Sequence, residues 1–407
     1  MPDFSPALSF EEARHLVETH AAGLHSRGKE LIPLLSSPGR ILGETITADR
    51  DFPPFPRATR DGFAVRASDL AVLPASLRII AEIKAGAQLD PTLQVRDGEA
   101  VAIMTGAAVP PGSDAVVMVE YTRTEQDRVE VRKSVAFGDN VVPQGAEAKR
   151  GDVLLSPGLR VDYPAIAVAA SVGRERLLVA RKPVIAVLAT GDEIVDLSVL
   201  PGPHQIRNSN SFSLASQILS AGGEPLILPV APDKSDRLRE LIQDGFEADL
   251  LLLSGGVSMG KYDLVEQVLA ELDAEFFFTG VEIQPGRPLV FGKAGSKYFF
   301  GLPGNPISTM VTFELFVRPV LQALAGAQPS KLIFTSAQLR SPVKTKTGLK
   351  RFLPALLSGE FECARVELLP WQGSGDIAAL VRANCFLVVP PDRDEIPAGE
   401  WVPVVLR

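Results

Sequence analysis

Three loops rich in glycine, small polar and acidic residues each follow an apolar run of strand length. They occupy residues 189–193, 254–263 and 301–306, and after each one the chain reads as a helix. Because parallel sheets place the carboxyl ends of their strands along one edge, such loops converge on one crevice. Glycine lets backbone N–H groups approach an anion, and the positive end of the following helix favours a phosphate there. The pattern therefore predicts a site for a phosphate-bearing ligand.

The elements that must position these loops alternate in type. Between residue 183 and about residue 325, strand-like runs alternate with helical stretches at 209–219, 235–246 and 307–324. The first of these stretches closes with a pair of glycines. Such alternation predicts a doubly wound α/β domain with a parallel sheet.

The flanking regions follow other patterns. Ser9 and Glu12 form a capping-box signature, and apolar residues at helical spacing predict a helix over 10–22. Short β-type runs between about 77 and 131 predict a small, mostly β domain. After residue 329, β-type runs bounded by proline and glycine continue to the end, with a helix expected only at 377–382.

Bulk properties indicate a soluble protein of about two to four domains, since the 407 residues are 46% apolar and 22% charged. The apolar runs fall short of the ~20 residues that a bilayer requires, and no secretory signal is readable, so no membrane association is predicted. Two cysteines give no disulfide framework, which favours a reducing cytoplasm. The net charge of −8 argues against nucleic-acid binding, which needs clustered Lys and Arg. An anionic ligand must then be held by loop amides, a few basic residues or a metal.

Several familiar catalytic motifs are incomplete or absent in this sequence. Gly255, Gly260 and Lys261 have the offsets of a Walker A loop, but Tyr262 stands where Ser or Thr must offer its hydroxyl to Mg²⁺. The four histidines lack the spacing and the cysteine partners of a zinc site. Neither the Rossmann fingerprint nor a Gly-x-Ser-x-Gly elbow occurs. The sequence therefore offers no support for a P-loop ATPase, a zinc site or a nucleophile-elbow hydrolase.

Short segments along the whole chain together resemble one known family. The segments are residues 59–66, 104–110, 190–193, 254–258, 284–288, 301–306, 373–377 and 398–400. Each segment is weak alone, but their order from the N-terminal helix to the C-terminal region is similar to that of the MoeA family, the molybdopterin molybdenumtransferases, which are related to the E domain of gephyrin. The resemblance covers nearly the whole chain.

The resemblance implies a reaction in molybdenum cofactor biosynthesis. Molybdate is inserted into the dithiolene of adenylylated molybdopterin, the adenylate is hydrolysed, and molybdenum cofactor and AMP are released. Molybdate and the pyrophosphate linkage are both anionic, so cations and oriented dipoles must bring them together. A divalent metal such as Mg²⁺, held by carboxylates, can do this. By resemblance, the four acidic positions of the family fall on Asp61, Glu147, Asp233 and Asp263, with Asp61 and Asp263 holding the metal or positioning water.

The resemblance also implies substrate contacts, although a structural role competes with several of them. Asp61 before Gly62 could also simply form a turn, and Asp263 could be a carboxylate that stabilises the first turn of a helix. Asp233 also resembles a helix-leading acid. Acidic residues of the first loop could cap the next element, Asn305 more readily shapes its loop, and a solvated turn competes at Ser374. The implied substrate-binding residues are Thr190, Gly191, Asp192, Glu193, Ser254, Gly255, Gly256, Val257, Ser258, Arg287, Pro303, Gly304, Asn305 and Ser374.

Two departures from the family pattern bear on the anion site. Glu147 stands where the family usually has Asp, which moves the carboxylate out by one methylene and puts direct metal ligation in doubt. The usual Lys-Pro-Gly-Lys-Pro reads Gln-Pro-Gly-Arg-Pro over 284–288. Arg287 keeps the positive charge and gains a planar donor fork, whereas Gln284 loses a charge.

By resemblance, the expected fold is a multidomain α/β protein of four domains. We expect an elongated linking domain (1–30, 43–51 and 138–180), an inserted β or lid domain (52–137), a MogA-like, doubly wound α/β molybdopterin-binding domain (31–42 and 181–328) and a C-terminal β-barrel-like domain (329–407). Members of the family are homodimers, and a molybdopterin adenylyltransferase is a further expected partner. Two other functions stay open: a non-catalytic, gephyrin-like scaffold that binds molybdopterin, favoured by the changes at Glu147 and Gln284, and a molybdopterin adenylyltransferase, disfavoured by the additional domains.

Overall fold

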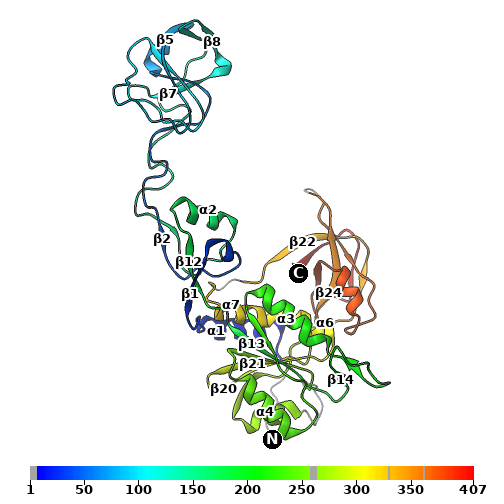
Figure 1. Cartoon of the computed structure of the whole chain (residues 1–407). Helices are drawn as coiled ribbons and strands as arrows, with labels where there is room; N and C mark the ends of the chain where they lie inside the picture. Colours follow the sequence, from blue (N-terminus) through cyan, green and yellow to red (C-terminus); the bar gives the residue numbers. More distant parts are fainter. Residues whose placement is uncertain (1–6, 257–263, 329–330, 361–362) are drawn as a thin grey trace. The chain divides into compact units, whose positions relative to one another are not determined.

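The computed structural model describes residues 7–256, 264–328, 331–360 and 363–407 (Figure 1). The chain forms two compact units. Unit 1 comprises Met1–Gly43, Gly158–Asp162 and Arg176–Arg407, and unit 2 comprises Glu44–Pro157 and Tyr163–Glu175.

Unit 1 is built around a six-stranded sheet in the order β16-β13-β17-β21-β20-β18. Its four parallel strands are β16 (Glu224–Ile227), β13 (Val184–Ala189), β17 (Leu250–Ser254) and β21 (Lys297–Leu302). Strand β20 (Val290–Ala294) pairs antiparallel with both β21 and β18 (Ala274–Phe278). Strands β13 and β17 are almost wholly apolar because both of their faces are buried, as is usual for parallel sheets.

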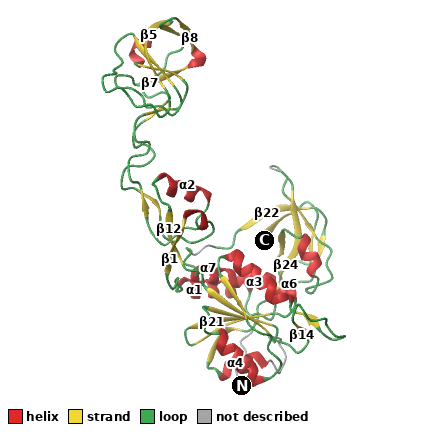
Figure 2. Cartoon of the chain, in the orientation of Figure 1, coloured by secondary structure: helices red, strands yellow, loops and turns green. Residues whose placement is uncertain are grey.

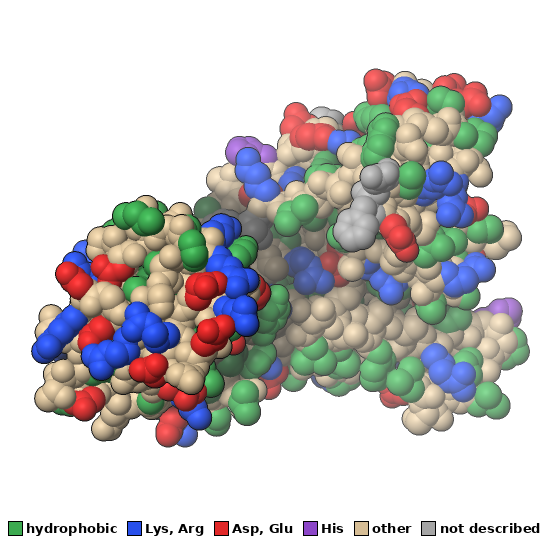
Figure 3. All heavy atoms as spheres, turned by 90° about the horizontal axis from the view of Figure 1, so that it is seen from above, with side chains coloured by type: hydrophobic (Ala, Val, Ile, Leu, Met, Phe, Trp, Pro, Cys, Tyr) green, Lys and Arg blue, Asp and Glu red, His purple; other side chains and the backbone are tan. Residues whose placement is uncertain are grey.

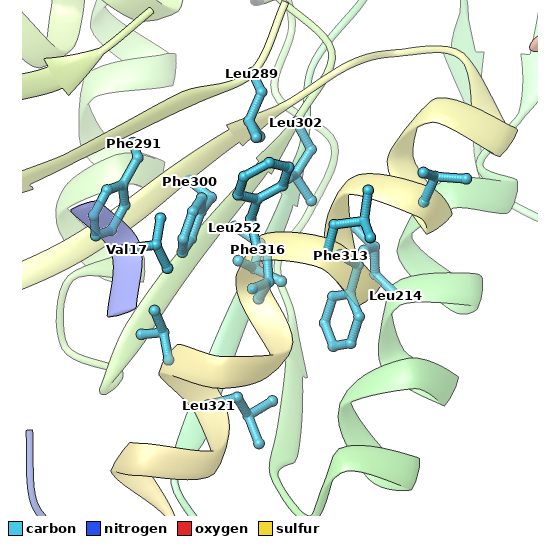
Figure 4. Close-up of a cluster of buried hydrophobic side chains, with 14 of the residues drawn as sticks. Val17, Leu214, Leu252, Leu289, Phe291, Phe300, Leu302, Phe313, Phe316 and Leu321 are labelled. Carbon is cyan, nitrogen blue, oxygen red and sulfur yellow. The ribbon is translucent and has the colours of Figure 1, made fainter. Parts of the chain in front are cut away.

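Helices cover both faces of this sheet (Figure 2). Ile185 and Leu252 pack in one core cluster with side chains of α1 (Phe10–Ala22) and α3 (Ser209–Ala221), whereas Ala186 and Leu251 pack in a second cluster with α4 (Ser235–Gly245) and α5 (Leu264–Glu271). Figure 4 shows the first cluster, to which Phe300 of β21 and Phe316 of the helical stretch after that strand both belong. Each such buried ring stabilises the fold by about 1.5–3 kcal/mol relative to an exposed one. The doubly wound prediction is confirmed.

The helical stretch after β21 has a π-helical centre that a proline explains. Helix α6 (Pro306–Thr312) continues into the π-helical segment η4 (Phe313–Val317) and then into α7 (Arg318–Leu324). Pro319 lacks the backbone N–H that would bond the carbonyl of Leu315, and its ring crowds that carbonyl. The buried side chain of Arg14 donates to the Leu315 oxygen instead. The helix therefore widens locally, and the Leu315 carbonyl that Pro319 leaves without a donor is hydrogen-bonded by Arg14.

Residues Pro306–Leu324 also form the one helix in the described ranges that is long and apolar enough to cross a membrane. Within unit 1, 72% of that stretch is buried. It packs against α1 and α3 in the core cluster of the sheet.

Helix α1 begins with the predicted capping box. The Ser9 hydroxyl accepts from the Glu12 N–H, and the Glu12 carboxylate accepts from the Ser9 N–H at 2.9 Å. Phe10 and Val17 of this helix are buried in the first core cluster. Strand β1 (Lys29–Pro33) follows, pairs antiparallel with β12 (Arg176–Ala180) and leads into a 3-10 turn, η1 (Leu34–Ser36). The division of the chain into four domains stays a prediction.

The C-terminal part of unit 1 is a closed β-barrel, as expected. The strand order β24-β25-β22-β28-β26 returns to β24 through a direct pairing with β26. The short strand β19 (Ile283–Gln284) joins β24 in parallel, and the predicted helix α8 spans Ile377–Arg382. The barrel strands are β22 (Phe334–Leu339), β24 (Lys350–Ser358), β25 (Arg365–Leu368), β26 (Cys385–Val389) and β28 (Trp401–Leu406), with a side pair β23 (Val343–Lys344) and β27 (Glu395–Ile396).

Unit 2 carries the expected small β region. Its sheet has the order β7-β4-β6-β5-β9-β8. Two pairs of short strands, β2 with β11 and β3 with β10, join the segments that enter and leave this region. The bounds are β2 (Ile46–Thr47), β3 (Arg57–Ala58), β4 (Gly62–Val65), η2 (Ala67–Leu70), β5 (Ala75–Ile83), β6 (Glu99–Ile103), β7 (Ala115–Met118), η3 (Val119–Tyr121), β8 (Thr122–Glu125), β9 (Arg128–Val131), β10 (Val141–Val142), β11 (Val153–Leu155) and α2 (Tyr163–Ser171).

Acidic and basic side chains are interspersed over the face of the molecule seen in Figure 3. The two cysteines are both free, with Cys363 exposed and Cys385 buried in the barrel. Burial raises the pKa of the Cys385 thiol to about 11.

Candidate functional site at the carboxyl edge of the sheet

The three glycine-bearing loops meet at the carboxyl ends of β13, β17 and β21, where they line a pocket of about 780 Å³, here called the crevice pocket. Its wall includes ten of the predicted site residues. The parallel pair of short strands β14 (Ile194–Val195) and β15 (Ile206–Arg207) and the first turn of α3 complete one side. The predicted residues in the wall are Thr190, Gly191, Glu193, Asp233, Ser254, Gly255, Gly256, Pro303, Gly304 and Asn305.

Glycine is required at two positions of the second loop. Gly255 and Gly256 have φ values of +90° and +65°, in the left-handed region. A Cβ at Gly255 would lie 2.8 Å from the carbonyl oxygen of Thr190, and one at Gly256 would lie 2.6 Å from a methyl carbon of Val265. The loop after β17 therefore packs directly against the loop after β13.

Not every glycine N–H group of the crevice pocket is free to bind an anion. The N–H of Gly191 donates to Ala231, and that of Gly255 donates to Leu302, so both serve the fold. Within the described ranges, the N–H groups of Glu193, Gly256, Gly304 and Asn305 in the pocket wall have no hydrogen-bond partner. These amides are available to an anion.

Asn210, which sequence reasoning missed, ties the loops together. Its Nδ2 donates to Ser254 Oγ at 3.0 Å, to the Gly304 carbonyl at 2.8 Å and to Thr309 Oγ1 at 3.4 Å. Its Oδ1 is buried and has no partner within the described part of the chain. The only sequence signal was its place in the first turn of a helix that follows the first loop.

Asp192 and Asp233 meet at one edge of the crevice. Asp192 Oδ1 accepts from the backbone N–H of Asp233 at 3.1 Å. Both side chains are exposed, and Asp233 lines the crevice pocket. The Asp192 side chain thus joins the first loop to the segment before α4, and Asp233 lines the crevice pocket. The substrate contacts of both residues stay predictions.

Asp61 and Glu147 belong to unit 2. Asp61 Oδ1 accepts from the N–H of Thr105 at 2.6 Å and from the Thr105 hydroxyl at 2.8 Å, and these bonds hold the pKa of its carboxyl below the usual value. Glu147 forms an exposed ion pair with Arg57 at 3.0 Å. Thr105 was missed as a functional residue, although it lies in a segment that the sequence singled out.

No group of three or more His, Cys, Asp or Glu side chains that could hold a metal lies within the described ranges. Asp263, Val257 and Ser258 fall outside those ranges. The metal assignment to Asp61 and Asp263 therefore stays a prediction.

The turn at 284–288 and the loop at 373–377 flank the crevice pocket through Pro288 and Gly375. Arg287 is exposed, and Gln284 Oε1 accepts from Arg351 Nε at 2.8 Å. The Ser374 carbonyl accepts from the N–H of Ile307, so the barrel loop is attached to the start of α6.

The fold and the crevice pocket define a multidomain α/β protein whose doubly wound domain opens at the carboxyl edge of its sheet. Three family models match it in chain order: the MoeA N-terminal region (domain I and II) over residues 8–173, a probable molybdopterin binding domain over 186–323, and the MoeA C-terminal region (domain IV) over 336–406.

Individual relatives agree over nearly the whole length. A molybdopterin molybdenumtransferase of Bacillus subtilis (strain 168) is 34% identical over 386 residues, which covers 93% of this chain and 89% of the relative. A molybdopterin molybdenumtransferase of Nostoc sp. (strain PCC 7120) is 33% identical over 416 residues, which covers 99% of this chain and 94% of the relative. Two structures of molybdopterin biosynthesis MoeA proteins from Pyrococcus horikoshii superpose on this chain. One has a TM-score of 0.81 and 28% identity and covers 99% of this chain and 100% of its own. The other has a TM-score of 0.73 and 33% identity and covers 98% of this chain and 99% of its own. This chain therefore belongs to the MoeA family, the molybdopterin molybdenumtransferases of molybdenum cofactor biosynthesis.

Proposed function

We propose that this chain inserts molybdate into the dithiolene of adenylylated molybdopterin, with Mg²⁺-dependent hydrolysis of the adenylate and release of AMP. The observation that carries the proposal is the crevice pocket, where loops from three parallel strands present unpartnered N–H groups and buried polar side chains. The names of the full-length relatives support the same substrate class.

In this proposal the crevice pocket binds the substrate. The N–H groups of Glu193, Gly256, Gly304 and Asn305 orient its anionic groups, as unpartnered backbone donors do in other anion sites. Asn210 fixes the second loop to the third loop, and these two loops carry the donors of Gly256, Gly304 and Asn305. Glu193 and Asp233 line the pocket and are placed to accept hydrogen bonds from the substrate.

The proposed divalent cation would be held mostly by substrate. Mg²⁺ usually keeps several waters and takes one or two carboxylates together with phosphate oxygens. Asp61 uses Oδ1 for Thr105, and its Oδ2 has no partner in the described ranges. Asp61 and Asp263 would hold the cation, which would supply charge stabilisation to the phosphates.

Arg287 and Ser374 complete the proposed oxyanion contacts beside the crevice pocket. The protein acts as a cytoplasmic homodimer in this proposal, with unit 2 of one subunit supplying Asp61 to the crevice of its partner. A molybdopterin adenylyltransferase would deliver the substrate.

A scaffold that binds molybdopterin without turnover is the second candidate. It is favoured by two contacts: Glu147 is already paired with Arg57, and Gln284 is already bonded to Arg351.

One assay separates the two functions. Purified chain is incubated with adenylylated molybdopterin, Mg²⁺ and either molybdate or no oxyanion, and AMP is measured. Molybdate-dependent AMP release is the expected result. Tight substrate binding with no AMP release in either arm would establish the scaffold instead.

A further inference from the structure

Arg351 is buried without an acidic partner. It lies in barrel strand β24 and is 6% exposed. Its Nε donates to Gln284 Oε1 at 2.8 Å and its Nη1 to the Leu349 carbonyl at 3.0 Å. In the described ranges no carboxylate lies within ion-pair distance of the guanidinium, and Nη2 has no hydrogen-bond partner there. Burial lowers the pKa of this guanidinium, and no carboxylate offsets that effect.

Other enclosed arginines in unit 1 have a carboxylate. Arg14 is bonded to Glu18 at 2.6 Å, Arg40 is paired with Glu30, and Arg318 is paired with Glu314. Arginine stays protonated in proteins, so a buried guanidinium without an anion is costly. Such a charge is tolerated where a ligand supplies the anion.

Arg351 lies next to the turn formed by residues 284–288. Strand β19 pairs with β24 so that Gln284 lies opposite Arg351. Gln284 opens the turn that runs through Arg287 to Pro288 in the wall of the crevice pocket. Gly286 packs this turn on α6, since a Cβ there would lie 2.5 Å from Thr312 Cγ2. The free Nη2 is not among the fully buried unpartnered atoms, so it reaches the surface beside a fixed turn.

The hydrogen bond between Gln284 and Arg351 also explains why position 284 is a glutamine rather than a lysine. A lysine at 284, which the resemblance leads us to expect, has donors only and would place a second positive charge against the guanidinium. The amide oxygen of Gln284 instead accepts from Nε and orients the arginine. The positive charge missing from the turn is thus present on the neighbouring strand.

We propose that Arg351 is an oxyanion-binding residue, whose free Nη2 takes a tetrahedral dianion of the molybdate class while Gln284 holds the guanidinium in place. The proposal rests on the proposed function for its ligand class. Gln284 is a positioning residue in it, and Arg351 and Arg287 together give the turn two forked donors for one oxyanion.

The test is equilibrium binding of molybdate, and separately of tungstate, to the purified full-length chain by calorimetry. Arg351→Met should weaken molybdate binding by about tenfold to a hundredfold, as expected for loss of a charge-assisted hydrogen bond. Gln284→Lys alone should also weaken it, because the new charge faces Arg351. The double variant Gln284→Lys/Arg351→Met should bind more tightly than Arg351→Met, since one cation returns to the turn. Arg340→Met is the matched control, an exposed barrel arginine whose removal should leave binding unchanged.

A purely structural role gives a different result. In that case Arg351→Met lowers the melting temperature while molybdate affinity stays at the wild-type value, and the double variant gains nothing; either observation overturns the proposal. If Arg351→Met does not fold, Arg351→Lys keeps the charge without the fork and must still bind more weakly than wild type. A wild-type chain that binds neither oxyanion also refutes the proposal. Binding that depends on Arg351 without AMP release would leave it standing while the transferase function fails.

Discussion

At the scale of single residues, the two proposed active-site carboxylates of unit 2 are held in different ways. Asp61 receives two hydrogen bonds from one residue, Thr105, whereas Glu147 is neutralised by Arg57. Hydrogen bonds to the charged form keep a carboxylate ionised at lower pH, which suits a metal-binding role. A salt-bridged glutamate is less available to a metal. The extra methylene of Glu147, relative to the usual Asp, also disfavours direct metal ligation.

Thr105→Val should raise the pKa of Asp61 toward its ordinary value. The folded-state pKa is depressed, so the ionised form persists to lower pH in the wild type and is lost as pH falls through that pKa. In the variant, the acid limb of the pH profile for AMP release should therefore shift to higher pH, with activity near neutral pH less affected. A parallel loss of activity at every pH, with no shift of the acid limb, would contradict this role.

Asn210→Asp tests the residue that joins the loops of the crevice pocket. The substitution keeps the shape but removes the Nδ2 donors to Ser254 and Gly304 and leaves a carboxylate beside a carbonyl. Breaking such bonds costs about 1–3 kcal/mol, so affinity for adenylylated molybdopterin should fall by roughly tenfold or more, measured by equilibrium binding. Ser216→Ala, an exposed change in the same helix, is the control. Equal affinity in both variants would show that the loops hold their positions without Asn210.

At the scale of elements, the π-helical segment shows how one proline is accommodated inside a core helix. Pro319 removes a donor, the helix widens over Phe313–Val317, and a side chain from another helix completes the hydrogen bonding. Gln217 of α3 acts similarly, donating to the Met310 carbonyl at 3.1 Å and to Glu314 at 2.7 Å. Two helices are thus fastened to the segment by polar contacts within an apolar core.

Arg14→Met should lower the free energy of unfolding by about 2 kcal/mol, because it leaves the Leu315 carbonyl unsatisfied and removes a charge-assisted bond. In a Pro319→Ala background the helix can supply an N–H to that carbonyl, so the same substitution should cost less. Denaturant unfolding of the four proteins in this double-mutant cycle measures the difference. Additive effects would mean that Arg14 and Pro319 are not linked through Leu315.

The same scale shows what sequence could and could not predict. Helix α1, the alternating elements and the converging loops were predictable because burial imposes local periodicity and parallel strands share one edge. Asn210, Thr105 and Arg351 escaped because their partners lie 44 or more residues away along the chain, and such contacts leave no local pattern. The amides of Gly191 and Gly255 were expected to face a ligand, yet both bond within the fold. Pro319 was visible in the sequence, but its effect depended on Arg14.

At the scale of the whole molecule, the proposed homodimer makes a sharp prediction. If Asp61 of one subunit serves the crevice of its partner, Asp61→Ala and Asp263→Ala should each be inactive alone and complement each other when mixed. Random pairing makes about half of the dimers mixed, and two-fold symmetry leaves one intact site in each, so about a quarter of wild-type AMP release should return. Subunit exchange is verified by tagging one variant. If exchange is complete and no activity returns, both carboxylates serve the same subunit.

The short strand pairs in unit 2 have a consequence for how this chain can be rebuilt. The segments entering and leaving the small β region are paired by β2 with β11, by a bridge between Phe52 and Ala148, and by β3 with β10. Its two ends are therefore held together whatever lies between them. Because closing a loop costs only about 0.6 kcal/mol more for each doubling of its length, we expect these strand pairs to persist when the length of this region changes. Replacing the region with a short hairpin should therefore leave the paired segments folded.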